Sequence, residues 1–164
     1  MEFHLKPMND SHWPDVAAIY LEGIETGIAT FETEIPEFKE WDKSHLTKCR
    51  SIAISDSKIV GWAALSAVSE RYVYAGVGEV SVYLLASAWG KGVGKALLSR
   101  LIEDSEKAGI WTLQAGIFPE NVASIQLHSS CGFREVGLRE KLGCLNGKWR
   151  DVLLMERRSE IAGV

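Results

Sequence analysis

The chain has 164 residues, of which 46% are hydrophobic and 24% charged, and this composition is typical of a folded globular domain rather than a disordered protein. No apolar run approaches the roughly 20 residues that cross a bilayer, and the N-terminus lacks the apolar segment of a secretory signal. The net charge of −4 argues against a bulk nucleic-acid binder, which needs a concentrated basic surface. We expect a single cytoplasmic domain over residues 1–164, with neither nucleic acid nor a membrane as partner.

Hydrophobic spacing and turn residues predict elements in the order β α α β β β α β α β β. In chain order the expected segments are Phe3–Lys6, Pro14–Gly23, Phe38–Leu46, Ser51–Ser55, Ile59–Val68, Gly78–Ala86, Gly92–Gly109, Trp111–Ile117, Val122–Cys131, Phe133–Leu142 and Lys148–Arg158. Asp10 or Ser11 is expected to cap the first helix, and Gly109 to end the long one. This order predicts an α/β protein of the α+β type, with a mixed, largely antiparallel sheet and flanking helices.

The positions of the cysteines and histidines predict neither a disulfide framework nor a metal site. The three cysteines form no CxxC pair and leave one unpaired in any disulfide scheme, as is typical of reduced thiols. We interpret them as core residues. His4, His12 and His45 have no partners at metal-ligand spacing, so the sequence predicts no metal site.

The stretch WGKGVGK, Trp89–Lys95, places three glycines between an apolar strand and a helix. A helix N-terminus exposes unpaired N–H groups, glycines let an anion approach them closely, and Lys91 and Lys95 add positive charge. The spacing matches neither the dinucleotide-binding G-x-G-x-x-G pattern nor a P-loop, which needs serine or threonine at Ala96. The pattern predicts a pyrophosphate cradle without metal, and a purely structural strand-to-helix turn is the alternative.

Two longer stretches carry a family resemblance. The run EVSVYLLASAWGKGVGKALLSRLI, followed later by NVASIQLHSSCGF, resembles the coenzyme A-binding core of the GNAT N-acetyltransferases. The segments GIATFETEIP, EVSVY and GKWRDVLLMERR resemble, more narrowly, the phosphinothricin and methionine sulfoximine N-acetyltransferase branch. The resemblance spans approximately Phe3–Arg158 and implies the GNAT fold, with acetyl-CoA as co-substrate.

The resemblance also implies where acetyl-CoA binds. The pyrophosphate would rest on the backbone of the glycine loop, and the pantetheine arm would pair with the strand before it like an added strand. Asn121 and Ser124 would contact the reacting region, although Asn121 also suits a helix N-cap and Ser124 an ordinary helical position. Trp89 stands where GNATs usually carry glutamine or arginine. The expected contacts are Val82, Tyr83, Leu84, Gly90, Lys91, Gly92, Val93, Gly94, Lys95, Asn121 and Ser124.

Direct attack by an amine on a thioester requires a base, because a protonated ammonium has no lone pair. The resemblance points to Glu79, at the start of the EVSVY strand, as this base; a solvated strand-end glutamate is the alternative. It points to His128 as the group that protonates the departing thiolate, where many relatives have tyrosine. A packing role is the alternative for His128.

For the acceptor, the resemblance implies contacts near the thioester and a homodimer. An arginine suits bidentate capture of a carboxylate, and Arg71 and Tyr74 belong to a segment that approaches the substrate in this branch. The branch continues with arginine after that tyrosine, whereas this chain has Ala75. Trp149 and Asp151 are further candidates, across a dimer interface. The expected substrate contacts are Phe31, Glu32, Arg71, Tyr74, Glu79 and Ser81.

The resulting hypothesis is an N-acetyltransferase that acetylates the α-amine of a small amino acid or analogue, of the phosphinothricin or methionine sulfoximine type. No covalent acyl-enzyme is required. Two alternatives remain, a peptide or protein N-terminal acetyltransferase and a non-catalytic acyl-CoA-binding module.

Overall fold

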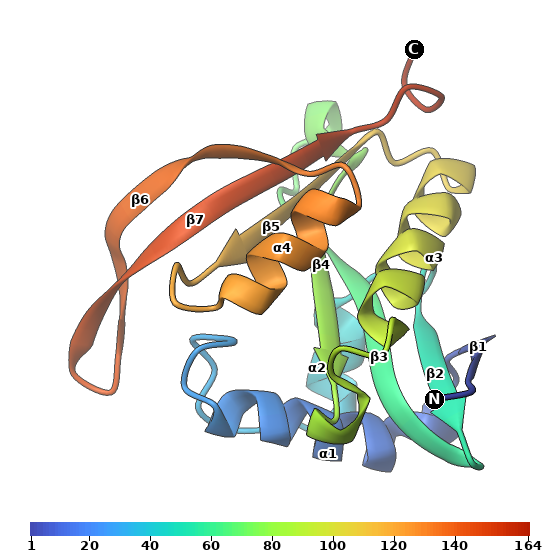
Figure 1. Cartoon of the computed structure of the whole chain (residues 1–164). Coiled ribbons are helices and arrows are strands. Elements are labelled where there is room, and N and C mark those ends of the chain that lie inside the picture. Colours follow the sequence, from blue (N-terminus) through green and yellow to red (C-terminus); the bar gives the residue numbers. More distant parts are fainter.

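A computed structural model describes all residues, 1–164, as one seven-stranded sheet with helices on both faces (Figure 1). The strands are β1 (His4–Pro7), β2 (Ser51–Ser55), β3 (Lys58–Ala67), β4 (Val77–Leu84), β5 (Thr112–Ile117), β6 (Arg134–Leu145) and β7 (Lys148–Arg158). The helices are α1 (Trp13–Glu25), α2 (Phe38–Ser44), α3 (Val93–Lys107) and α4 (Val122–Ser130). Short 3₁₀ turns occur at Asp10–His12, Tyr72–Tyr74 and Ala86–Ala88.

The strands lie in the order β1-β2-β3-β4-β5-β7-β6. Every neighbouring pair is antiparallel except β4 and β5, which run parallel. The predicted order of elements and the mixed, largely antiparallel sheet are therefore confirmed. The parallel pair is possible because α3 provides the long crossover that parallel neighbours require.

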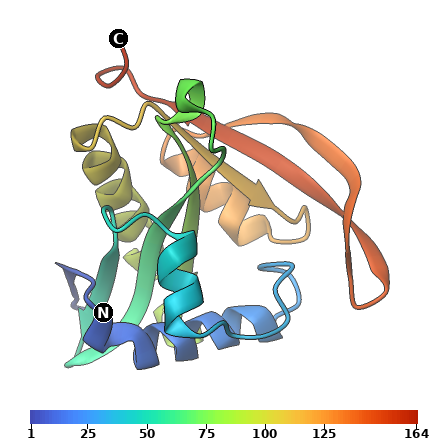
Figure 2. The same cartoon turned by 180° about the vertical axis from the view of Figure 1, so that it is seen from behind.

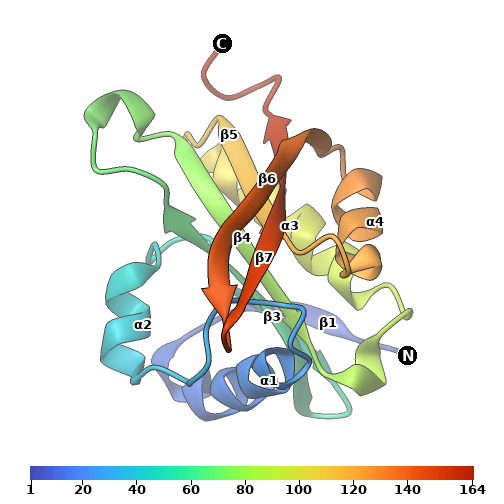
Figure 3. The same cartoon turned by 90° about the vertical axis from the view of Figure 1, so that its left-hand side faces the viewer.

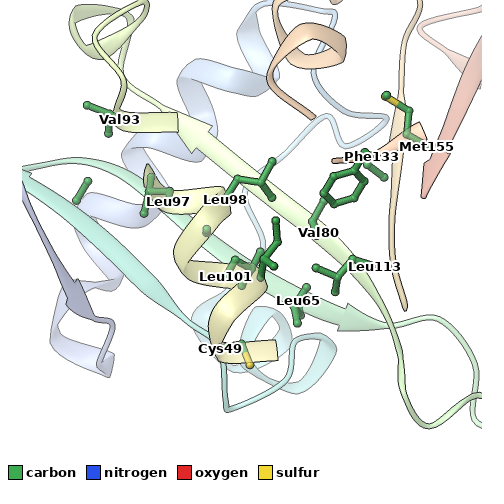
Figure 4. Close-up of a cluster of buried hydrophobic side chains, with 14 of the residues drawn as sticks. Cys49, Leu65, Val80, Val93, Leu97, Leu98, Leu101, Leu113, Phe133 and Met155 are labelled. Carbon is green, nitrogen blue, oxygen red and sulfur yellow. The ribbon is translucent and has the colours of Figure 1, made fainter. Parts of the chain in front are cut away.

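The two faces of the sheet have separate hydrophobic layers. On one face, α3 packs Leu97, Leu98 and Leu101 against residues such as Leu65 of β3 and Leu113 of β5 (Figure 4). On the other, α1 and α2 cover a cluster that includes the buried indoles of Trp41 and Trp62 (Figure 2). Alternation along β3 supplies both layers, because successive side chains of a strand point to opposite faces.

The strands β4 and β5 separate partway along their length, and the site described below lies at this separation. The parallel ladder between β4 and β5 consists of three rungs and ends where Glu79 lies opposite Gln114. Beyond this rung the two strands diverge, and α4 lies beside the gap (Figure 1). The edge of β4 that faces β5 therefore has no sheet partner over its second half.

The β6–β7 hairpin extends away from the rest of the molecule (Figure 2). Its register shifts between Arg139 and Gly143, so that extra residues of β6 bulge out opposite β7. The Asp151 side chain accepts a 2.8 Å hydrogen bond from the backbone N–H of Lys141 at this bulge. Bulges bend a strand and redirect its side chains.

Local expectations were wrong at two places. Neither Asp10 nor Ser11 caps α1; instead the Asn9 side chain caps the preceding 3₁₀ turn by accepting from the Ser11 N–H, and the chain then continues into the helix. Cys49 is buried as predicted, but Cys144 is exposed, because it lies on the solvent-facing edge strand β6. Gly109 follows the end of α3 with φ +80°, as expected of a helix-terminating glycine.

None of the helices combines the length and the apolar character needed to cross a membrane.

Candidate active site

The glycine loop enters α3 through two residues in the left-handed region. Gly90 has φ 68° and Gly92 has φ 82°, conformations that residues with a Cβ rarely adopt. Gly94 is required for a different reason, since a Cβ there would lie 3.2 Å from Leu84 Cδ1 and 3.3 Å from Leu127 Cδ2. The three glycines therefore meet both backbone and packing requirements, and the strand-to-helix turn is also a structural feature.

The start of α3 is chemically open. Gly92 is its N-cap, and no side chain caps the helix, so its first N–H groups and the positive end of its dipole are available to an anion. Lys91 and Lys95 are exposed beside the loop and Val93 is buried beneath it, and none of these three lines the cavity described next. The loop therefore offers backbone donors more directly than lysine side chains.

A cavity of about 560 Å³ runs from this loop along the free edge of β4. One wall is β4 itself and the facing wall is α4, which contributes Ser124 and Leu127. The exposed indole of Trp89 lies at the loop end. From β4 and the loop, the lining residues are Val82, Tyr83, Leu84, Gly90, Gly92 and Gly94.

A second cavity, of about 380 Å³, adjoins the first on the side of the β6–β7 hairpin. The two cavities share Ala29, Val82, Tyr83, Asn121 and Ser124 in their linings. They therefore meet at β4, beside the N-terminal half of α4. The sequence-predicted residues that line this second cavity are Phe31, Glu32, Glu79, Ser81, Val82, Tyr83, Asn121, Ser124 and His128.

Glu79 lies at the last rung between β4 and β5, and its carboxylate is partly exposed to the smaller cavity. The Gln114 side-chain amide donates a 3.3 Å hydrogen bond to Glu79 Oε1. This contact holds one carboxylate oxygen, and no other side chain hydrogen-bonds the group. The arrangement leaves Glu79 able to accept a proton from a molecule in the cavity.

His128 is buried in α4, with 4% of its surface exposed. Its Nδ1 lies 2.7 Å from the backbone carbonyl oxygen of Ser124. Because a carbonyl can only accept, Nδ1 carries the proton of the neutral ring, and Nε2 presents a lone pair. Burial lowers the pKa of His128, although the Ser124 carbonyl opposes this effect. Nε2 has no hydrogen-bond partner within the protein.

Asn121 joins two parts of the site. Its side-chain oxygen accepts from the Ser124 N–H at 3.2 Å, so it is the N-cap of α4, and its side-chain amide donates to the Ile28 carbonyl at 3.3 Å. The N-cap alternative is thus correct, and the same side chain also lines both cavities. Ser124 lines both cavities too.

The segment after α1 forms one wall of the smaller cavity. The Phe31 ring meets Phe118 edge to face, with the ring centroids 4.8 Å apart. It also lies against the β6 backbone at Gly143, where a Cβ would approach the ring to 2.8 Å. Arg150 of β7 donates to the Gly27 carbonyl at 3.0 Å and holds the start of this segment. Loop, hairpin and β5 therefore meet around the cavity.

Tyr83 is partly buried and lines both cavities. Its ring stacks on Tyr20, at a centroid distance of 4.9 Å, and on Trp62. Burial, and secondarily the neighbouring Tyr20, raise the pKa of Tyr83, so the phenol stays protonated. Its backbone, rather than an ionised side chain, is what the strand offers to a ligand.

Arg71 and Tyr74 are not brought to the cavity. Both lie at the exposed 3₁₀ turn between β3 and β4, which projects beyond the sheet in Figure 3, and neither lines the smaller cavity. The Arg71 guanidinium instead lies 5.4 Å from the ring centroid of Tyr74. The turn precedes β4 at the end away from the point where the cavities meet, which accounts for the separation.

The structure adds cavity residues that the sequence analysis missed, among them Gln114, Phe118, Arg139 and Leu142. A signal for Gln114 was present, since it is a polar residue in the apolar run WTLQAGI. Arg139 and Leu142 flank or belong to the bulge in β6, and a bulge has no local sequence pattern that would have indicated them. No group of three or more His, Cys, Asp or Glu side chains is arranged to hold a metal ion.

The fold and the two adjoining cavities define a class of protein. The family model described as the acetyltransferase (GNAT) family matches residues 13–133. The chain therefore belongs to the GNAT acetyltransferase family, as its motifs indicated. It is an acetyl-CoA-dependent N-acetyltransferase.

Individual relatives agree with the narrower resemblance. The chain is 33% identical to a phosphinothricin N-acetyltransferase of Alcaligenes faecalis, over 93% of this chain and 81% of the relative. It is 41% identical to an L-methionine sulfoximine/L-methionine sulfone acetyltransferase of Salmonella typhimurium, over 48% of this chain and 46% of that one.

Two solved structures confirm the fold. A phosphinothricin acetyltransferase of Sinorhizobium meliloti in complex with AcCoA superposes with TM-score 0.90 at 31% identity, covering 99% of this chain and 91% of that one. A ribosomal-protein-alanine N-acetyltransferase of Brucella melitensis superposes with TM-score 0.87 at 28% identity, covering 95% and 99%.

Proposed function

We propose that this enzyme acetylates the α-amine of a small amino acid or analogue, of the phosphinothricin or methionine sulfoximine type. The observation that carries the proposal is the junction of two cavities at β4, with Glu79 and His128 lining the smaller one. A cavity of about 380 Å³ is within the range of small-molecule sites. The relatives named above act on amino acid analogues of this size.

In this proposal, acetyl-CoA occupies the larger cavity. The N–H groups at the start of α3 and the glycine loop, Gly90 to Lys95, bind its pyrophosphate. The free edge of β4 from Val82 to Leu84 pairs with the pantetheine arm, and Asn121 and Ser124 face it from α4. This arrangement directs the thioester toward the junction with the smaller cavity.

Glu79 is the proposed general base. It takes a proton from the acceptor ammonium and so frees the nitrogen lone pair for attack on the thioester carbonyl carbon. Gln114 orients the carboxylate through the bond to Oε1 and leaves the other oxygen free. A backbone N–H at Val82 or Tyr83 stabilises the negative charge that develops on the thioester oxygen.

His128 is proposed to carry the second proton. Its neutral ring presents a bare Nε2, so it must accept a proton before it can donate one. We infer that it accepts the proton that the nitrogen loses as the C–N bond forms, and gives that proton to the sulfur as the C–S bond breaks. Donation to the thiolate, as in the sequence-based hypothesis, is thus the second half of a relay.

Phe31, Glu32 and Ser81 are proposed to shape the acceptor end, because all three line the smaller cavity. Arg71 and Tyr74 lie outside the cavity of their own chain, so any contact that they make with substrate would come through a homodimer. We propose such a homodimer for this single-domain, cytoplasmic enzyme. Supporting it, Trp149 on the hairpin is 61% exposed and Tyr72 is 93% exposed, although large apolar side chains favour burial.

The alternative of acetylating a peptide or protein N-terminus is favoured by the fold match to the Brucella melitensis enzyme. Against it, the Phe31 ring packs on Phe118 and against Gly143 and forms part of the wall of the smaller cavity. The volume of this cavity, about 380 Å³, suits a single amino acid better than a peptide chain. A non-catalytic acyl-CoA-binding module would not need a glutamate held by Gln114 in the smaller cavity.

The test is acetyl-CoA-dependent thiol release with L-amino acids, methionine sulfoximine, methionine sulfone, phosphinothricin, polyamines and short peptides as acceptors. We expect turnover with amino acid analogues, and a Glu79→Gln variant with kcat lower by about 10²–10³-fold. Glu135→Gln, on the exposed part of β6, is the matched control and should behave as the wild type. Turnover with peptides alone would replace the proposal by the first alternative. Acetyl-CoA binding without any turnover would favour the second.

A further inference from the structure

We propose that Arg139 binds the acceptor's carboxylate and thereby selects amino acids over simple amines. The inference rests on the proposed function and names a group that neither the family motifs nor the relatives' names assign. It concerns the side of the smaller cavity formed by the β6–β7 hairpin.

The register of the hairpin places Arg139 toward the cavity. Arg139 lies directly opposite Val152 of β7, and residues directly opposite in an antiparallel pair project from the same face. Val152 is buried in the cavity wall, packed with Phe118. Arg139 therefore emerges on the cavity face and is itself among the lining residues.

The bulge that follows Arg139 is held in place from both strands. Regular pairing resumes only at Gly143, and Asp151 accepts from the Lys141 N–H within the bulge. Gly143 in turn leaves room for the Phe31 ring. This end of the hairpin is thus a packed wall, in which the backbone of Arg139 is fixed beside the smaller cavity and its side chain is exposed.

The charges around the cavity are complementary to an amino acid. Two carboxylates, those of Glu32 and Glu79, line it together with one cationic side chain, Arg139. An α-amino acid carries an ammonium, which a carboxylate can bind, and a carboxylate, which an arginine can bind. Arginine is well suited to the second role, because its planar guanidinium forms two parallel hydrogen bonds to a carboxylate.

Arg139 is also the arginine that is free to act. It makes no ion pair and no side-chain hydrogen bond within the chain. Arg150, the other arginine near this wall, already donates to the Gly27 carbonyl, pairs with Glu120 at 3.4 Å and lies over the Phe118 ring. Arg71 lies outside the cavity. Of the three, only Arg139 has an unused guanidinium at the site.

The experiment compares two acceptors at saturating acetyl-CoA, L-methionine sulfone and its carboxamide, in which a neutral group of similar size replaces the carboxylate. The quantity measured is the ratio of kcat/KM for the acid to that for the amide. Three variants are compared with the wild type: Arg139→Gln, Arg139→Lys, and Arg134→Gln as matched control. Arg134 lies on the same strand, pairs with Glu156 and does not line the cavity.

We expect the wild type to favour the acid by about 10- to 100-fold, the value of a charge-assisted bidentate contact. Arg139→Gln should lower the ratio by about 10- to 100-fold by losing activity on the acid alone, with an unchanged KM for acetyl-CoA. Arg139→Lys should be intermediate, and Arg134→Gln should keep the wild-type ratio.

A wild-type ratio retained in Arg139→Gln, or an equal loss in Arg134→Gln, would overturn the role of Arg139 while acetylation of small amines stood. Turnover of neither acceptor nor any other small amine by the wild type would overturn the proposed function, and this subsite with it. The two failures are therefore distinguishable.

Discussion

The two cavities that meet at β4 are built in different ways. The larger one is lined, on the side of β4 and the glycine loop, by the nearly continuous stretch from Val82 to Gly94, whose backbone groups we propose as the binding surface. The smaller one takes its chemistry from side chains on β4, β5, β6, α4 and the loop after α1. We infer that the shape of the larger cavity depends on local backbone conformation, whereas the shape of the smaller cavity depends on how distant elements pack. We therefore expect variants in the larger cavity to change the KM for acetyl-CoA, and variants in the smaller cavity to change kcat or the acceptor KM.

Among the variants that test this division between the cavities, the largest effect is expected at His128. His128→Gln should lower kcat by about 10²-fold, because it removes the group proposed to relay a proton. The KM for acetyl-CoA should change little, because His128 lines only the smaller cavity. Ser129→Ala, next to it on the exposed side of α4, is the control for changes in the helix. Steady-state kinetics with both substrates varied would check this, and a kcat near the wild-type value would refute the relay.

Next in size is Gly92→Ala, which tests the backbone site. A left-handed conformation costs a residue with Cβ about 1–2 kcal/mol, and relieving this strain would displace the N–H groups of the cradle. We expect the KM for acetyl-CoA to rise about tenfold, with the acceptor KM unchanged.

Gly109→Ala is the matched control for Gly92→Ala. Gly109 has φ 80°, also has open space around its Cα, and lies at the opposite end of α3. Gly109→Ala should lower the melting temperature as much as Gly92→Ala does, while leaving the KM for acetyl-CoA unchanged. Equal kinetic effects of the two substitutions would mean that the loop acts through stability alone.

A smaller effect is expected at Gly143, on the acceptor side. In Gly143→Ala the new Cβ would meet the Phe31 ring at 2.8 Å, so that the ring and its loop must move. Because Phe31 lines only the smaller cavity, we expect the acceptor KM to rise about fivefold and the KM for acetyl-CoA to stay the same. Gly137→Ala, on the same strand and with nothing near its Cβ position, should be neutral. A rise in the KM for acetyl-CoA instead would contradict the division between the cavities.

The smallest expected effect concerns the stability of the fold at mildly acidic pH. Burial lowers the pKa of His128 below its usual 6.5, so between the two pKa values the unfolded chain binds more protons than the folded one. The stability is therefore complete above about pH 6.5 and is lost as the pH falls, by at most about 1.4 kcal/mol per pH unit.

Chemical denaturation between neutral pH and mildly acidic pH would measure this slope. His128→Gln should reduce the slope, because it removes a group whose pKa differs between the folded and unfolded chain. Part of the pH dependence of stability should persist in this variant, since burial also lowers the pKa of His45. An unchanged slope in His128→Gln would show that His128 is not the group that titrates.

Particular elements show how far the sequence could predict the structure. Each strand and helix was expected near its observed position, because apolar periodicity and turn residues are local signals. The prediction that Asp10 or Ser11 caps the first helix was wrong, because both residues belong to a 3₁₀ turn that Asn9 caps. The family resemblance assigned Glu79 and His128 to one active site, and both line the smaller cavity. The partnership of Glu79 with Gln114 was missed, because these residues are 35 positions apart.

The sequence by itself therefore determined the order of elements, the glycine loop and the family. These depend on residues within one or two turns of each other, for which spacing and φ preferences are sufficient. Only the tertiary structure decided that Arg139 lines the smaller cavity and that Arg71 does not. The direction of Arg139 depends on the register of β6 against β7, and a shift of one residue in register turns a side chain to the opposite face. That register is set by packing across the sheet, which no single segment of the chain encodes.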